Sequence, residues 1–148
     1  MTSSTEQIRS LIYEYAEAVD TARFDRLSQL FAHGALRFGA LGGSQLRGNA
    51  VGQFFRDTVI LYDDGTPRTK HLTTNVSITV DESTGTATAR SYATVLQQLP
   101  GRGIEPIMSS RYEDKFERVT DVWRFVERLS HRDLAGDISR HARLPKTS

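Results

Sequence analysis

Cysteine is absent from the 148-residue chain, which excludes disulfide bonds, a thiolate nucleophile and metal sites built from cysteine. No apolar run approaches the length of a membrane-spanning helix. The N-terminus also lacks the basic and apolar segments of a secretory signal. We therefore expect a cytoplasmic protein that does not bind a membrane.

An excess of charge of one sign is missing as well. The chain holds 19 Lys and Arg residues against 18 Asp and Glu residues, and no basic run is interleaved with aromatic residues. This balance argues against a nucleic-acid partner, because nucleic-acid binding needs a basic patch. A small, weakly charged molecule is the expected partner.

Repeats, linkers and low-complexity segments are also lacking. With 38% hydrophobic residues, the chain fits a single domain over residues 1–148. A domain of this size buries about 70% of the surface of its unfolded chain, enough for a real core.

Helical spacing of apolar residues marks the N-terminal part. A capping box at Ser3 and Glu6, or one residue later, predicts a helix that ends near Asp20. A short second helix follows Thr21, and Asn49 can cap a third. Between the last two lie a short strand, 35–38, and a glycine-rich connection, 39–43.

Period-2 alternation marks the rest of the chain. It predicts long strands at 68–80, 86–96, 106–119 and 122–130, joined by hairpin turns. Helices first and antiparallel strands later indicate an α+β domain, with three N-terminal helices packed on one face of a curved sheet. We expect the segment from His131 to be a polar tail that could reach a cavity mouth through His131, Arg132 and Asp133.

His71 lies near the start of the first long strand. Strict alternation places His71, Thr73 and Asn75 on one face and an apolar set on the other: Leu72, Thr74, Val76, Ile78 and Val80. A histidine titrates near neutral pH and can act as an acid or base, although a lone strand histidine is more often structural. A catalytic role therefore needs a partner. Asp20 is a candidate, unless it merely caps the second helix.

The strand at 106–119 has two contrasting faces. Arg111, Glu113 and Lys115 form a solvated face, while Ser110, Tyr112 and Asp114 point toward the helices together with Met108 and Phe116. Apolar walls with a few hydrogen-bonding groups are typical of a ligand cavity. An ordinary half-buried strand is the alternative. In the final strand, alternation sets Trp123, Phe125 and Leu129 opposite Val122, Val126 and Arg128.

Three segments, 15–27, 67–71 and 121–125, resemble the SnoaL-like branch of the nuclear transport factor 2-like superfamily, with scytalone dehydratase and the lindane dehydrochlorinase as its closest echoes. The resemblance implies a cone of helices and strongly bent sheet around a pocket. In those enzymes an aspartate at the end of the first helix holds a histidine that removes a proton. Asp20 and His71 occupy the matching positions, and Ser110 matches a pocket serine.

The sequence departs from scytalone dehydratase at other pocket positions. Val19 and Ala40 stand where that enzyme has two water-holding tyrosines, Gln97 replaces a second histidine, and Tyr112 replaces an asparagine. What remains is a base with an orienting acid in a differently lined pocket. Such a pair suits elimination, isomerisation or cyclisation.

Our first hypothesis is a cofactor-independent lyase or isomerase of the dehydratase, dehydrochlorinase or cyclase type. It would act on a small apolar, cyclic or polyketide-like molecule through an Asp20–His71 dyad. The candidate substrate contacts are Tyr15, Asn75, Tyr92, Met108, Ser110, Tyr112 and Trp123. No metal site is expected, because the four histidines lack ligand spacing.

The competing hypothesis is a non-catalytic protein that binds small ligands or serves in assembly, like the small subunit of ring-hydroxylating dioxygenases, which shares this fold. Under either hypothesis we expect a homo-oligomer, a dimer or trimer, since proteins of this fold often pair through the outer sheet face. The face with Leu72, Val76, Ile78 and Val80 would serve if the helices cover the other side.

Overall fold

The structure is a computed structural model that describes residues 2–39, 42 and 44–143. Its helices are α1 (Ser4–Asp20), α2 (Phe24–Leu30) and α3 (Asn49–Thr58). Its strands are β1 (Ala35–Phe38), β2 (Gln45–Arg47), β3 (Thr69–Asp81), β4 (Thr86–Gln97), β5 (Glu105–Val119) and β6 (Val122–Ala135). The predicted order of elements is confirmed. Strand β2 was not predicted, and Ala40, Leu41 and Gly43 of the glycine-rich connection lie outside the described residues.

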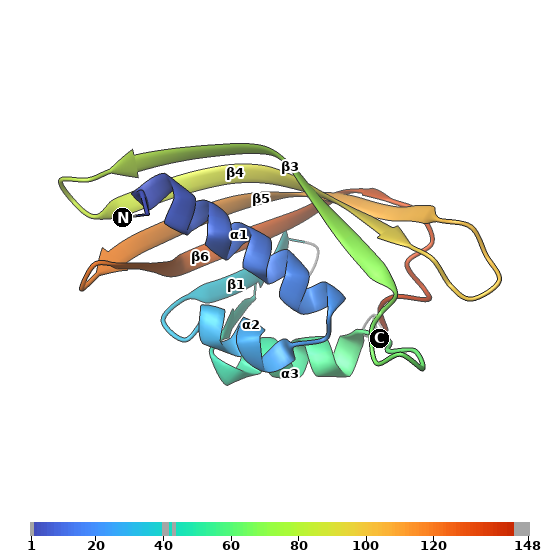
Figure 1. The fold of residues 1–148 in the computed structure, drawn as a ribbon. Helices are drawn as coiled ribbons and strands as arrows, with labels where there is room; N and C mark the ends of the chain where they lie inside the picture. Colours follow the sequence, from blue (N-terminus) through green and yellow to red (C-terminus); the bar gives the residue numbers. More distant parts are fainter. Residues whose placement is uncertain (1, 40–41, 43, 144–148) are drawn as a thin grey trace.

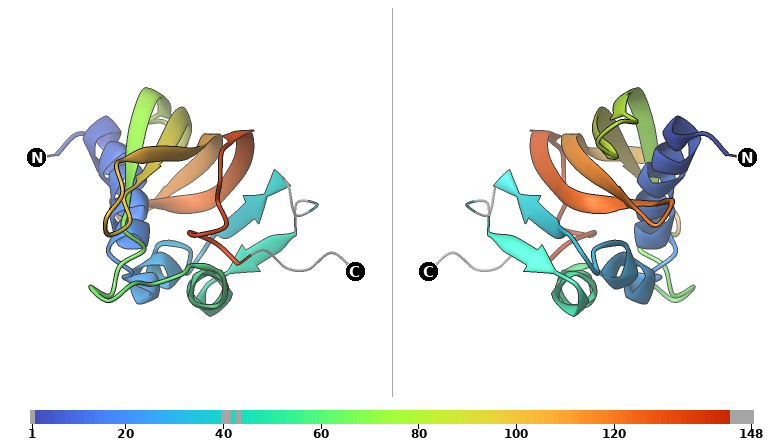
Figure 2. Two further views of the ribbon diagram at one scale, coloured as in Figure 1. Left: turned by 90° about the vertical axis from the view of Figure 1, so that its right-hand side faces the viewer. Right: turned by 90° about the vertical axis from the view of Figure 1, so that its left-hand side faces the viewer.

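The six strands form one open mixed sheet in the order β2-β1-β6-β5-β4-β3. Only β1 and β6 run parallel within it, and the other pairings are antiparallel. The four long strands arch over the helices, with α1 lying diagonally beneath the sheet (Figure 1). The end-on views in Figure 2 show all three helices on the concave side. The predicted α+β architecture, with its curved and mostly antiparallel sheet, is therefore confirmed.

Helix α1 begins and ends as its sequence predicts. The Ser3 hydroxyl accepts a hydrogen bond from the Glu6 backbone N–H at 3.2 Å, which satisfies one of the free donors of the first turn. Its buried face packs on the inside of the sheet with Ile8, Ile12, Tyr15, Ala16, Ala18 and Val19. The helix ends at Asp20, so this carboxylate stands where α1 meets β3.

Helices α2 and α3 approach each other closely. The Gly52 N–H donates to the Ser28 hydroxyl at 2.9 Å, and a Cβ at Gly52 would collide with that hydroxyl and with the Phe24 carbonyl. The expected cap at Asn49 is wrong by one residue. Asn49 is the first helical residue, and the cap position belongs to Gly48, whose φ of 53° favours glycine.

Strand β3 contains a bulge that alternation alone does not reveal. Asn75 and Val76 together stand opposite the single residue Ser91 of β4, and Asn75 has a φ of 54°. Before the bulge, Thr69 and His71 face the helices. After it, the facing switches, and the partly buried residues are Val76, Ile78 and Val80, which pack against the core.

This bulge corrects two expectations. Asn75 does not share a buried face with His71; its side chain is exposed. The four residues proposed as an apolar outer patch for oligomer contacts also do not share one face. Leu72 is 45% exposed, whereas Val76, Ile78 and Val80 turn toward the core.

Strand β6 has a comparable irregularity at Val126. Phe116 pairs with Phe125 and Lys115 with Glu127, which leaves Val126 as the extra residue. Trp123 and Phe125 face the core as predicted, but beyond the bulge Arg128 and Ser130 face inward while Leu129 is only half-buried. The predicted facing of Leu129 and Arg128 is therefore wrong. Nor is the chain from His131 a tail at first, since β6 continues to Ala135.

Candidate active site

Asp20 and His71 meet where the end of α1 reaches the start of β3. The Nδ1 atom of His71 lies 2.6 Å from Oδ1 of Asp20. Both side chains are largely withdrawn from solvent, with 5% of the His71 side chain and 13% of the Asp20 side chain exposed. The contact has the short separation of a charge-assisted hydrogen bond.

The Asp20 carboxylate accepts two further hydrogen bonds, both from β3. Its Oδ1 accepts from the Thr69 hydroxyl at 2.8 Å, and its Oδ2 accepts from the His71 backbone N–H at 2.7 Å. Helix α2 has no side-chain cap, so the alternative role of Asp20 as the N-cap of that helix is wrong. Because an ionised carboxylate only accepts, the fitting tautomer of His71 carries its proton on Nδ1 and leaves a lone pair on Nε2.

His71 lines a cavity of about 280 Å³ between the helices and the inner face of the sheet. Its walls are mainly apolar and include Val19, Phe38, Phe54, Phe55, Val59 and Val95. The other groups with polar atoms are Tyr15, Thr58, Ser110, Tyr112, Ser130, Arg132 and His141. No carboxylate is among the lining residues, so Arg132 is the permanent charge at this cavity within the described part of the chain.

Four of the seven predicted substrate contacts line this cavity with His71: Tyr15, Met108, Ser110 and Tyr112. The predicted inward facing of Ser110, Tyr112 and Asp114 is confirmed, since all three are buried. Arg132 also reaches the cavity, as the sequence suggested for this segment. The structure does not bring the other three predicted residues to the site.

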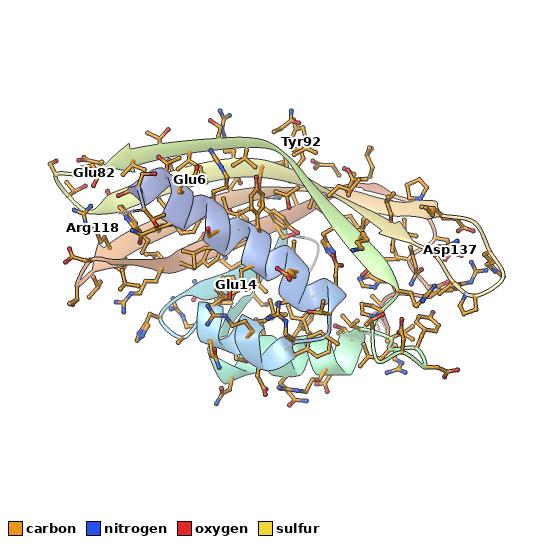
Figure 3. All side chains as sticks on the ribbon, viewed as in Figure 1. Glu6, Glu14, Glu82, Tyr92, Arg118 and Asp137 are labelled. Atoms are coloured by element: carbon orange, nitrogen blue, oxygen red, sulfur yellow. The ribbon has the colours of Figure 1, made fainter. Side chains whose placement is uncertain are left out.

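Asn75 and Tyr92 lie on the outer face of the sheet, together with Ser77 and Arg111. The bulge displaces Asn75, and Tyr92 is 49% exposed because its face of β4 is the convex one. Figure 3 shows Tyr92 above the sheet, on the side away from the helices. Trp123 is buried but distant from the cavity: it pairs with Arg118 next to the β5–β6 turn, with the guanidinium 5.3 Å from its ring centre.

A buried ion pair lies behind the two cavity tyrosines, and alternation alone misses it. Arg128 donates from Nε to Oδ1 of Asp114 at 2.8 Å and from Nη2 to Oδ2 at 2.9 Å, and both side chains are 0% exposed. Burial raises the pKa of the Asp114 carboxyl, and the Arg128 charge opposes that rise. The two parallel hydrogen bonds fit an ionised carboxylate, because a guanidinium keeps its proton in proteins.

Tyr15 and Tyr112 both contact the Arg128 guanidinium with their rings, which meet each other edge to face at a centroid distance of 5.8 Å. The central carbon of the guanidinium lies 4.4 Å from the Tyr15 ring centre and 3.8 Å from that of Tyr112. Burial raises the pKa of the Tyr15 hydroxyl well above its usual value, and that of Tyr112 is raised for the same reason. Both residues are therefore neutral phenols that can donate hydrogen bonds into the cavity.

His141 is a second imidazole at the cavity, and the sequence reading missed it. It lies in the segment after β6, where its ring lines the wall and the residue is 4% exposed. Burial lowers the pKa of His141 to about 4, with a further decrease from His71 and an opposing effect of Asp20. The ring is therefore neutral at neutral pH. No local motif signals this position, since 70 residues separate the two histidines.

The described residues contain no group of three or more His, Asp or Glu side chains placed to hold a metal ion. Within the same part of the chain, none of the helices has the length and apolar character needed to cross a membrane.

Comparison with known proteins agrees with this architecture. Rv2910c, an uncharacterized protein of Mycobacterium tuberculosis, is 27% identical over 129 residues, which cover 83% of this chain and 81% of that protein. The structure of Rv3472, a protein of unknown function from the same species, is 25% identical with a TM-score of 0.68, over 86% of this chain and 70% of that one.

ActVI-ORFA from Streptomyces coelicolor shares the fold, with a TM-score of 0.71 at 19% identity over 89% of this chain and 98% of its own. A structure from Novosphingobium aromaticivorans named a putative scytalone dehydratase also shares the fold, with a TM-score of 0.66 at 17% identity over 90% of this chain and 86% of that one. Residues 1–129 match the model of the SnoaL-like domain. With most of its length matched in this way, the chain belongs to the SnoaL-like domain family of the nuclear transport factor 2-like superfamily.

Proposed function

We propose that this protein is a cofactor-independent lyase or isomerase that removes a proton from a small, largely apolar, cyclic or polyketide-like substrate. One observation carries the proposal. His71 is held through Nδ1 by a buried carboxylate at 2.6 Å, and the same ring lines an apolar cavity. A histidine oriented in this way is a recurrent general base.

Each group of the pair has a distinct task. The Nε2 lone pair of His71 takes the proton from carbon, and Asp20 stabilises the imidazolium that forms. The two hydrogen bonds from Thr69 and the His71 backbone hold the carboxylate in place, so little reorganisation is needed during the step. The proton then returns to another atom of the substrate, or a leaving group departs.

The cavity walls fit a substrate of this class. A volume of about 280 Å³ bounded mainly by aliphatic and aromatic side chains suits a compact ring system. The Tyr112 and Ser110 hydroxyls are available for hydrogen bonds to substrate oxygens, because both residues line the cavity. The absence of carboxylates among the lining residues favours a substrate on which negative charge develops.

The test is proton exchange at carbon, which does not require the natural substrate. We expect the protein to catalyse deuterium incorporation from D₂O next to the carbonyl of 2-tetralone, followed by NMR. His71→Ala should reduce this rate by about 10²- to 10⁴-fold, the usual effect of losing a positioned base. The matched control is His33→Ala, which removes an exposed histidine that does not line the cavity.

Two results would contradict the proposal. One is undiminished exchange in His71→Ala. The other is a wild-type protein that binds 2-tetralone, seen by ligand-observed NMR, without any exchange. The second result would favour the competing hypothesis of a non-catalytic small-ligand-binding or assembly protein.

A further inference from the structure

His141 is a polar group of the cavity that the proposed Asp20–His71 pair does not use. Its residue is 4% exposed, and its Nδ1 atom is buried without a hydrogen-bond partner among the described residues. Nδ1 is closed off from the cavity, so Nε2 is the ring nitrogen that can reach a ligand there, and no side chain of the described residues is its hydrogen-bond partner. The ring stands in the wall of the same cavity as His71.

The backbone around His141 is firmly fixed. Its carbonyl accepts from the Ile60 N–H at 2.8 Å, and its own N–H donates to the Ile138 carbonyl at 3.0 Å. On the C-terminal side, Ala142 forms a β-bridge with Val59. This wall of the cavity therefore has a defined position.

Side chains from two other segments hold the preceding residue. The carbonyl of Arg140 accepts from the Gln97 side chain at 3.3 Å and from the Tyr62 hydroxyl at 2.5 Å. Gln97 is buried at the end of β4 and also donates to the Pro67 carbonyl at 3.0 Å. These contacts connect the His141 segment to the loop before β3, so the two imidazoles keep a fixed relation.

We propose that His141 is a hydrogen-bond donor to the substrate oxygen on which negative charge develops when His71 removes the neighbouring proton. This inference rests on the proposed function and adds the residue that binds the substrate oxygen. Catalytic proton removal from carbon is strongly assisted by a donor already directed at the developing oxyanion.

The electrostatics of the wall support a neutral donor. The titratable and charged groups near the ring are His71, with Asp20 behind it, and Arg132 in the cavity lining. The other neighbours of this wall, Thr58, Val59, Ile138 and Ala142, carry no charge. Burial holds the pKa of His141 at about 4, so the ring is neutral at pH 7 and presents one N–H.

The step balances without a further reactant. The Nε2 lone pair of His71 forms a bond to the proton, the C–H electron pair becomes the C=C bond of an enolate, and the carbonyl π pair moves to oxygen. The His141 N–H donates a hydrogen bond to that oxygen and keeps its proton. The enolate then regains a proton at another carbon or expels a leaving group.

A donor role for His141 restricts the class of substrate. A donor in the wall of the same cavity as the base is useful only where the carbon that loses its proton lies next to a carbonyl. The expected substrates are therefore cyclic ketones, such as β-hydroxy or unsaturated ketones, rather than halogenated hydrocarbons that lack oxygen.

The test compares two ligands of matched shape. 2-Naphthol is the aromatic counterpart of the enol of 2-tetralone, and naphthalene lacks only its oxygen. We expect the wild-type protein to bind 2-naphthol more tightly than naphthalene, measured by fluorescence titration. In His141→Leu the preference should fall about tenfold, the effect of one hydrogen bond of about 1.4 kcal/mol. His141→Gln, which keeps an N–H donor, should recover part of it.

Catalysis gives the second measurement. His141→Leu should lower kcat for deuterium exchange into 2-tetralone by about 10²- to 10³-fold, as expected for loss of an oxyanion donor, with a much smaller change in KM. His131→Gln is the matched control, because His131 is a half-buried partner of Glu113 and does not line the cavity.

The outcomes separate the two proposals. If His71→Ala abolishes exchange while His141→Leu keeps both its kcat and its preference for 2-naphthol, the role of His141 is wrong and the proposed function stands. If the wild-type protein binds 2-tetralone but shows no exchange, the proposed function fails. In that case an unchanged 2-naphthol preference in His141→Leu would overturn the donor role too, and a lost preference would support it as a binding contact.

Discussion

Two carboxylates are withdrawn from solvent under this sheet, and they differ in what they hold. Asp114 has both oxygens paired with one guanidinium, and neither side chain of the pair is exposed. Asp20 holds the imidazole of His71 through Nδ1, and His71 lines the cavity. Arginine does not lose its proton in proteins, whereas histidine exchanges one near neutral pH. The same acid can therefore support a wall at one place and a proposed reaction at another, depending on its partner.

Position strengthens this contrast. The Asp114–Arg128 pair lies behind Tyr15 and Tyr112, whose rings cover the guanidinium on the cavity side. The Asp20–His71 pair lies at the cavity itself. We expect substitutions at the first pair to appear as lost stability, and those at the second as lost turnover.

The largest expected effect is on turnover. Asp20→Asn keeps the shape of the side chain but removes the charge that stabilises the imidazolium, so the exchange rate should fall by up to about 10⁴-fold. Adding His71→Ala should cause little further loss, because one residue acts through the other. The rate of deuterium exchange into 2-tetralone measures the loss in the single variants and in the double variant. A double variant whose loss equals the product of the single losses would show that the residues act independently.

The corresponding change in the buried ion pair should reduce stability. Arg128→Met leaves the Asp114 carboxylate buried without its partner, at a cost of about 3–5 kcal/mol in the free energy of unfolding. Urea denaturation measures it. Combining Arg128→Met with Asp114→Leu should restore most of the loss, because the orphan charge is then gone. A double variant as unstable as the single one would show that the pair is needed for more than mutual neutralisation.

An effect of intermediate size is expected on the pH dependence of stability, through His141 in the cavity wall. The pKa of His141 is lowered from 6.5 to about 4 in the folded protein, so only the unfolded chain binds this proton between those values. The folded state therefore loses stability as the pH falls from about 6.5 to about 4, by roughly 3 kcal/mol in total. His141→Gln should flatten this part of the pH profile of unfolding. Identical profiles in the two proteins would show that the ring protonates normally.

The smallest effect is expected at the β3 bulge. Asn75 adopts a φ of 54°, which costs most residues about 1–2 kcal/mol but is tolerated by asparagine and glycine. Asn75→Ala should therefore lower the free energy of unfolding by about 1 kcal/mol, while Asn75→Gly should be nearly neutral. Neither should change 2-naphthol affinity, since the side chain is on the outer face. A loss of affinity would mean that the bulge also sets the position of His71.

The sequence predicted the elements well because each depends on local patterns. The capping box at Ser3, the long alternations and the turns between them are short-range signals. The contact between Asp20 and His71 came from the resemblance, which supplied a pairing across 51 residues that no local pattern contains.

What the sequence did not show depends on single extra residues and on long-range contacts. Alternation cannot locate a bulge, so the inward turn of Arg128 after Val126 and the outward position of Asn75 were missed. His141 reaches the cavity only because the chain after β6 folds back onto the end of α3. That return depends on backbone hydrogen bonds, which carry no side-chain pattern.

The switch of facing at Asn75 has a practical consequence for redesign. Upstream of it, the inward positions of β3 hold the polar residues that bind Asp20. Downstream, they hold aliphatic residues that pack against the core. Residues around His71 can therefore be changed to alter substrate selectivity without substitutions in the hydrophobic half of the strand. Deleting one residue at the bulge, by contrast, would restore strict alternation along the whole strand. The side chains of one half would then point to the opposite face of the sheet.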